Sequence, residues 1–169
     1  RQGTGGLQAW LKVAGGKLVG VTADLRLSGV KTRLAKTLPE LDLRHLGGRL
    51  SWLQVERGFQ VEAKRLAVDG PEIRFPAANF FLRYQAADAG HAESGQLRAE
   101  DIALDPLRQL AEHLPLAPAQ REALNDVEPR GRVKQASLSW DGPLESPTRY
   151  EAKAIREGRT PAYFIFRKG

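Results

Sequence analysis

The chain of 169 residues contains no cysteine and no methionine, and only 7% of its residues are aromatic. Without cysteine, neither a disulfide framework nor a cysteine-based zinc site can form. No run approaches the roughly 18 consecutive apolar residues of a membrane-spanning helix, and no signal-peptide pattern opens the chain. Because the first residue is Arg1, we expect an excised segment, with any anchor or targeting signal outside these residues.

Recognisable catalytic and metal-binding motifs are also lacking. His45, His91 and His113 lie far apart in the sequence, and none has metal-ligand spacing with another histidine. The acidic neighbours Glu100 and Asp101 would point to opposite faces of a regular strand, so they would not share one pocket. We therefore expect a protein that is not an enzyme and that needs no cofactor and no metal.

The net charge is +6, from 26 basic and 20 acidic residues. The basic residues are spread from Arg1 to Lys168 with acidic residues between them. The motif of aromatic and basic residues that marks an RNA-binding sheet is missing. We interpret the charge as the solvated outer face of a sheet, with no nucleic-acid partner.

What the sequence does contain is strict alternation of apolar and polar residues. The clearest run has five apolar residues interleaved with polar residues or glycine: Val19, Val21, Ala23, Leu25 and Leu27. Successive side chains of a β-strand point to opposite faces of the sheet. The run therefore predicts a strand with one apolar and one polar face.

Similar runs recur along the chain and predict about eight or nine strands, longer than the average strand. Such alternation is typical of an antiparallel sheet with one solvated face. Gly15-Gly16 predicts a β-hairpin between two of the runs. Leu66 and Val68 follow Ala63 on the opposite parity, which predicts a β-bulge near residues 64–65. Residues 29–40 fit a helical turn and an irregular crossover equally well.

One segment has helical character. Asp105 can cap a helix whose first residue is Pro106, and apolar residues then recur at helical spacing. We predict a short helical hairpin at about residues 105–127 within a β-groove segment spanning residues 1–155. Residues 156–169 do not alternate; we interpret them as an irregular, non-native tail without a function.

The apolar face of the sheet must be covered, and three functions remain open. Two sheets could pack as a structural or protein-interaction β-sandwich, or carboxylates could form a hydrolase. Alternatively, one curled sheet could leave an open apolar groove for acyl chains, which gain about 0.8 kcal/mol per buried methylene. The proposed acyl-chain contacts are Leu11, Val13, Val19, Val21, Ala23, Leu25, Leu27, Phe59, Val61, Phe80, Leu82 and Leu97.

Several passages of the chain resemble the YhdP branch of the AsmA-like and TamB-like bacterial envelope proteins. They are residues 21–25, 34–43, 46–52, 103–107, 114–116 and 129–140. The resemblance implies a mainly β fold, a long-stranded curled antiparallel sheet that forms a taco-like groove with one short helical hairpin.

The same resemblance implies a function in lipid transport and outer-membrane biogenesis. The chain would be one segment of a very long protein that is anchored in the inner membrane and crosses the periplasm. Its expected partners are phospholipid and the neighbouring groove segments of the same chain, with membrane contact only through parts outside this segment.

Overall fold

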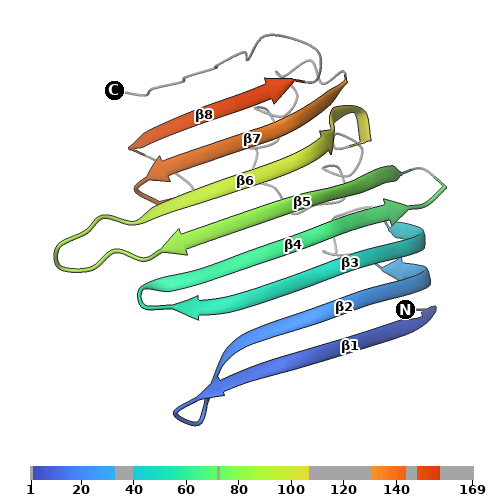
Figure 1. Cartoon of the computed structure of the whole chain (residues 1–169), viewed down its shortest axis with the longest axis horizontal. Coiled ribbons are helices and arrows are strands. Elements are labelled where there is room, and N and C mark those ends of the chain that lie inside the picture. Colours follow the sequence, from blue (N-terminus) through green and yellow to red (C-terminus); the bar gives the residue numbers. More distant parts are fainter. Residues whose placement is uncertain (1, 33–39, 72, 107–130, 144–147, 157–169) are drawn as a thin grey trace.

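The computed structural model of the chain describes residues 2–32, 40–71, 73–106, 131–143 and 148–156. These residues form one antiparallel sheet of eight strands in sequence order (Figure 1). The strands are β1 (Gln2–Ala14), β2 (Lys17–Thr32), β3 (Leu41–Val55), β4 (Gly58–Asp69), β5 (Arg74–Gln85), β6 (Ser94–Ala103), β7 (Arg132–Asp141) and β8 (Arg149–Arg156). The predicted mainly β fold with a long-stranded, curled antiparallel sheet is confirmed.

Alternation of apolar and polar residues accounts for the length of the strands, which reaches 16 residues in β2. The hairpin between β1 and β2 turns at Gly15 and Gly16, whose φ angles are 55° and 73°. Positive φ at both central residues is the geometry that two-residue hairpins prefer, and glycine adopts it without steric cost. The predicted hairpin is therefore confirmed.

The predicted β-bulge lies at Arg65, a non-glycine residue with a φ of 52°. Between β4 and β5, Ala63 is opposite Phe80, but the next pair is Leu66 opposite Ala78. The backbone N–H of Arg65 donates a hydrogen bond of 2.9 Å to the Oδ1 atom of Asn79. Side chains that alternation alone would place on opposite faces thus stay on one face of β4.

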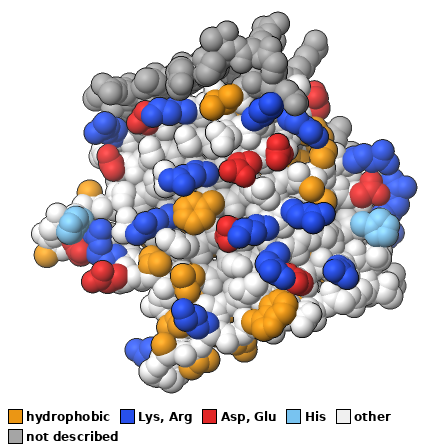
Figure 2. Space-filling model, in the orientation of Figure 1, with side chains coloured by type: hydrophobic (Ala, Val, Ile, Leu, Met, Phe, Trp, Pro, Cys, Tyr) orange, Lys and Arg blue, Asp and Glu red, His pale blue; other side chains and the backbone are white. Residues whose placement is uncertain are grey.

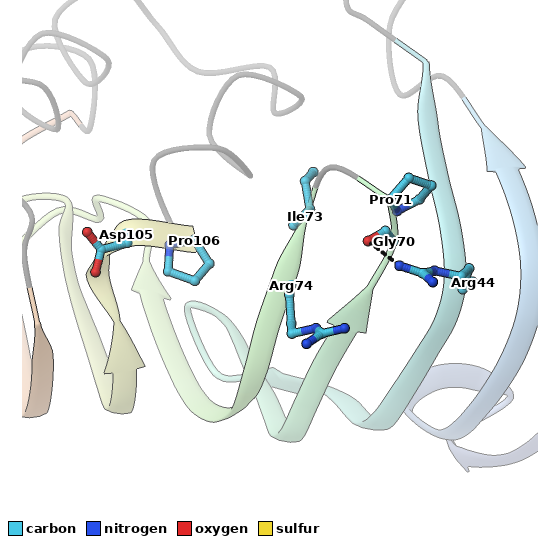
Figure 3. A pocket seen from close by; sticks show the side chains of 7 residues that line it. All are labelled: Arg44, Gly70, Pro71, Ile73, Arg74, Asp105 and Pro106. Carbon is cyan, nitrogen blue, oxygen red and sulfur yellow. Dashed lines mark hydrogen bonds between the residues drawn. The ribbon is translucent and has the colours of Figure 1, made fainter.

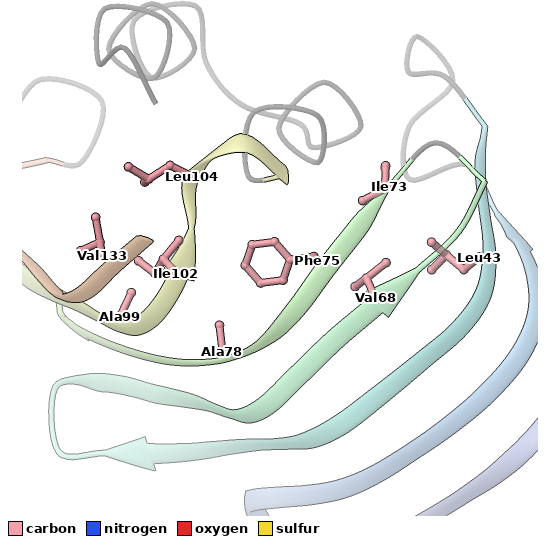
Figure 4. Packing of buried hydrophobic residues seen from close by; sticks show 9 residues of the cluster. All are labelled: Leu43, Val68, Ile73, Phe75, Ala78, Ala99, Ile102, Leu104 and Val133. Carbon is pink, nitrogen blue, oxygen red and sulfur yellow. The ribbon is translucent and has the colours of Figure 1, made fainter. Parts of the chain in front are cut away.

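Strands β6 and β7 also have backbone or register irregularities. In β6, Asp101 has a φ of 58°, and the pairing of β7 with β8 shifts between Val133 and Gln135. Bulges bend the strand that carries them and increase its twist. Figure 4 shows the sheet curling around the buried apolar side chains.

The buried core lies on the concave side of this curl. It is one cluster of apolar side chains, of which Phe75 is only 1% exposed. In Figure 4 these side chains point into the concavity from several strands. The cluster consists of Leu43, Val68, Ile73, Phe75, Ala78, Ala99, Ile102, Leu104 and Val133.

All of the described strands belong to this single sheet. The β-sandwich that the sequence left open would need a second sheet, so the described strands do not support it. A second sheet is also not needed to cover the apolar face of the described strands, because the long strands curl and partly enclose it themselves.

Parts of the sequence-based predictions fall on residues that the structure does not describe. Of the helical hairpin predicted at about 105–127, only the helical turn at its start, which reaches Pro106, is described. The predicted tail lies outside the described residues except for Arg156, which ends β8. In the segment 29–40, β2 continues to Thr32, and residues 33–39 are not described.

Among the described residues, no helix is long and apolar enough to cross a membrane.

The bend of the sheet depends on close approach of the backbone at Gly48. Its φ is 144°, and a Cβ there would lie 2.9 Å from the Cα of Leu66. We predict that Gly48→Ala lowers the free energy of unfolding by about 1–3 kcal/mol, because a methyl group must displace backbone at a strained φ. Chemical denaturation measures this change.

The adjacent Gly47 supplies the matched control. A Cβ at Gly47 would have its nearest contact at 3.8 Å, an ordinary van der Waals distance. Gly47→Ala should therefore leave stability unchanged or slightly raised. Equal destabilisation by the two substitutions would show that close approach at Gly48 does not shape the sheet.

Candidate functional site

The register of the sheet aligns apolar side chains in a row that crosses all eight strands. Residues directly opposite each other in an antiparallel pair share a face, so the pairing can be followed from strand to strand. We call this the first inner row: Leu11, Val21, Trp52, Val61, Leu82, Leu97, Leu138 and Ala152. With strands about 4.8 Å apart, it extends over roughly 34 Å.

A second row runs parallel to the first, two residues along each strand. This second inner row is Ala9, Ala23, Leu50, Ala63, Phe80, Ala99, Ala136 and Ala154. Ala99 belongs to the buried cluster on the concave side, so both inner rows line the concavity. Alanine predominates in the second row, which makes it a shallow floor beside the bulkier first row.

The structure brings together most of the residues that the sequence predicted to contact acyl chains. Leu11, Val21, Val61, Leu82 and Leu97 are members of the first inner row, and Ala23 and Phe80 are members of the second.

The remaining predicted residues lie beyond these rows. Leu25 and Leu27 continue along β2, where Leu27 is opposite Leu46 of β3. Phe59 stacks on Tyr84, with ring centroids 5.3 Å apart. Val13 is opposite Leu18, and Val19 falls in the register shift between β1 and β2, so it has no direct partner on β1.

Exposure of the inner face differs along the sheet. At the β1 end Leu7, Leu11 and Val13 are 63%, 67% and 61% exposed, whereas the inner rows of β4 and β5 are half-buried or buried. Exposed apolar patches of this kind mark binding surfaces.

Sequence reasoning missed several apolar residues of the concave side. Leu43, Val68, Phe75, Ile102 and Val133 are buried, yet they lie past the bulges, where the period-two pattern changes parity. The parity change at Leu66 and Val68 was the available signal. This parity change also extends the inner face past the bulge to Val68.

The hairpin turns along one edge of the groove are linked to one another. The Nη1 atom of Arg57, in the turn between β3 and β4, lies 3.2 Å from the Oδ2 atom of Asp88, in the loop between β5 and β6. The backbone N–H of Ala86 donates to the carbonyl oxygen of Arg57, and that of Gly142 donates to the carbonyl oxygen of Glu93. These contacts join strands β3 to β8 into one continuous lip.

Electrostatics at this lip centre on Asp88. The backbone N–H of Gly90 and the side chain of His91 hydrogen-bond to its carboxylate and lower its pKa to about 2. The Nδ1 atom of His91 lies 2.9 Å from the Oδ1 atom of Asp88. On the inner side of the lip, desolvation raises the pKa of Tyr84, and Glu93 adds to this effect.

The outer face of the sheet has the opposite character. Basic and acidic side chains are interspersed over its strands (Figure 2). Arg49 donates two hydrogen bonds to Asp24, at 2.5 and 2.8 Å, and its guanidinium lies 5.7 Å from the ring centroid of Trp10. The hydrogen bond to Arg49 lowers the pKa of Asp24. This face is charged and exposed, as the alternation predicts for a solvated surface.

A depression of about 370 Å³ lies at the other edge of the groove (Figure 3). Arg44 and Arg74 line it, and both contact Asp69, at 3.8 and 3.2 Å. Arg44 also donates a hydrogen bond to the carbonyl oxygen of Gly70. These contacts hold the β4–β5 connection. In the described part of the chain, no three histidine or acidic side chains are grouped to hold a metal.

The low pKa of Asp88 makes the stability of the lip depend on pH. The folded-state pKa of about 2 lies below the ordinary 3.8, so the ionised carboxylate stabilises the fold above pH 3.8. This contribution is lost as the pH falls from 3.8 toward 2. We predict that Asp88→Asn, which keeps an oxygen acceptor for Gly90, destabilises the chain above this window and has no effect at its lower end.

Denaturant titrations of both proteins at several pH values measure this difference. A difference that stays constant across the window would contradict a stabilising charge on Asp88.

Comparison with known protein families supports one assignment. The family model described as YhdP protein matches residues 1–158. Comparisons with curated proteins and with solved structures gave no match. The matched range contains all eight strands and both inner rows, so the chain belongs to the YhdP family.

Proposed function

We propose that this chain is a segment of a bridge-like lipid-transfer protein that conducts phospholipid acyl chains between the inner and outer membranes. The observation that carries the proposal is the unbroken pair of apolar inner rows, which cross every strand of an open sheet. In this function the chain is not an enzyme, and it uses no cofactor. Acyl chains would lie on the rows, and transport would proceed along the rows, across the strands.

The energetics of burial fit this function without a specific polar site. Each methylene removed from water contributes about 0.8 kcal/mol, so fifteen methylenes contribute on the order of 12 kcal/mol. Because the inner rows repeat similar side chains from strand to strand, a chain shifted by one strand meets nearly the same surface. Similar binding at successive positions favours sliding over trapping.

Membership of the YhdP family suggests an envelope protein of the lipid-transport type. We propose accordingly that it acts in the periplasm, with its anchor in the inner membrane. Phospholipid is the proposed ligand, and nucleic acid is not a partner.

The two outer strands suggest how segments would join. β1 pairs only with β2, and β8 pairs only with β7, among the described strands. Each therefore has one edge without a described strand partner, and such edges pair readily with further strands. Neighbouring groove segments of the same chain would continue the inner rows across both edges.

Val21 tests the conduit because it is the β2 member of the first inner row and is only half-buried. A carboxylate against acyl chains costs about 3 kcal/mol, a roughly hundredfold loss of occupancy. We predict that Val21→Asp loses co-purifying phospholipid while the chain stays folded. Mass spectrometry of extracted lipid measures occupancy, and circular dichroism measures folding.

Thr22→Asp supplies the matched control, because it introduces the same charge on the next residue. Thr22 faces the outer side, where its hydroxyl lies 3.2 Å from that of Ser51. Its lipid occupancy should equal that of the unaltered chain. Unfolding of Val21→Asp would show a packed core at this position, and undiminished lipid in Val21→Asp would refute the conduit.

A further inference from the structure

The type of side chain on the inner face changes from row to row between the floor of the groove and one lip. The second inner row is mostly alanine, and the first is mostly leucine and valine. The next row toward the linked turns is aromatic. Beyond it come the charged groups of the turns, Arg57, Asp88 and Glu93 among them.

The aromatic row spans four consecutive strands, three of which contribute an aromatic residue. Phe59 of β4 is opposite Tyr84 of β5, Tyr84 is opposite Gly95 of β6, and Gly95 is opposite Trp140 of β7. A Cβ on Gly95 would collide with the indole of Trp140, so the absence of a side chain at Gly95 makes room for this ring. We call this row with its adjoining turns the aromatic lip.

The polar atoms of these rings are placed differently from one another. The hydroxyl of Tyr84 hydrogen-bonds to Glu93, which belongs to the loop at the lip. Trp140 is only 5% exposed, and its Nε1 atom is buried without a hydrogen-bond acceptor among the described residues. Buried N–H donors nearly always have an acceptor in a complete structure. The N–H of Trp140 is therefore a donor that a bound oxygen acceptor would satisfy.

The opposite lip has no comparable row among its described residues. Its buried side chains, including Leu43, Ile73, Phe75, Leu104 and Val133, are all hydrocarbon. They form a compact cluster around Phe75, which stacks on Phe80 with ring centroids 6.1 Å apart. Among its described residues, this lip has no buried side-chain polar atom without a hydrogen-bond partner.

We propose that phospholipids lie in the groove in one orientation, with the glycerol-ester and headgroup end over the aromatic lip, positioned by Tyr84 and Trp140. The inference rests on the proposed function, which it deepens by assigning an orientation to the ligand. The acyl chains then extend onto the two inner rows. An ester or phosphate oxygen accepts the N–H of Trp140.

The order of side-chain types from the floor of the groove to the aromatic lip supports this orientation. Tyrosine and tryptophan combine an apolar ring with a polar group, and they concentrate where hydrocarbon meets water. A phospholipid has the same order of chemistries, from methylenes through ester oxygens to a charged headgroup. Its order matches the steps from the alanine floor through the aromatic row to the charged turns. At the opposite lip, Arg44 and Arg74 already contact Asp69, and the buried side chains described there are hydrocarbon with no Tyr or Trp between them and the charges.

The absence of native cysteine allows a direct test with single fluorescent labels. Ala92→Cys places a label in the exposed loop of the aromatic lip, and Arg132→Cys places one at the exposed start of β7 on the opposite lip. Each labelled chain is loaded from phosphatidylcholine vesicles that contain headgroup-nitroxide lipid, then separated from the vesicles. Fluorescence quenching and extracted lipid are both measured.

We expect strong quenching at residue 92 and weak quenching at residue 132. Equal quenching at the two lips, or stronger quenching at residue 132, would overturn the orientation while bound lipid still supports the conduit. Chains that take up no lipid would overturn the proposed function, and the orientation would fall with it. The amount of extracted lipid therefore distinguishes a wrong orientation from a wrong proposed function.

Trp140→Phe tests the positioning role, because it keeps a ring and removes only the N–H and part of the indole. Loss of one hydrogen bond should lower lipid occupancy about two- to tenfold and reduce the contrast in quenching between the lips. The lipid-free chain should lose no hydrogen bond. Unchanged occupancy and contrast in a folded Trp140→Phe chain would refute the role of Trp140.

Discussion

Continuous antiparallel pairing in register is the constraint on which the structure depends. Residues directly opposite each other in neighbouring strands share a face. Each pairing in register therefore places the apolar side chains of one strand beside those of the next. Leu11 of β1 is thereby connected, strand by strand, with Ala152 of β8. A one-residue slip at any pair would move a whole strand's apolar side chains to the outer face. The groove is therefore a property of the register, and no single residue creates it.

The bulges convert this flat pattern into a groove. At Arg65 and Asp101 the backbone adopts positive φ, and the strands bend while their apolar side chains stay on the inner face. The curl buries a hydrocarbon cluster at one lip, and the aromatic residues Phe59, Tyr84 and Trp140 lie at the other. The two lips thus differ chemically although the same strands build both. This difference is the basis of the lipid orientation that we propose.

Much of this architecture was predictable from alternation, which indicated the strands, the hairpin at residues 15–16 and the bulge near Arg65. The alternation also identified seven of the sixteen residues of the two inner rows. It did not identify Phe75 or Val133, because parity cannot be followed through an unrecognised bulge. Nor could it reveal the approach of Trp140 to Gly95, which depends on the pairing of β6 with β7. Pairing between strands arises from tertiary structure, and local pattern does not encode it.

The central claim is that the first inner row is open to an acyl chain along its whole length. Thiol reactivity of single cysteines at Leu11, Val21, Leu82 and Leu138 tests it most directly, in the lipid-free chain and after loading with phospholipid. The account predicts that all four react in the lipid-free chain and that lipid protects them together. Cysteines that are unreactive in both states, or reactive in both, would contradict it.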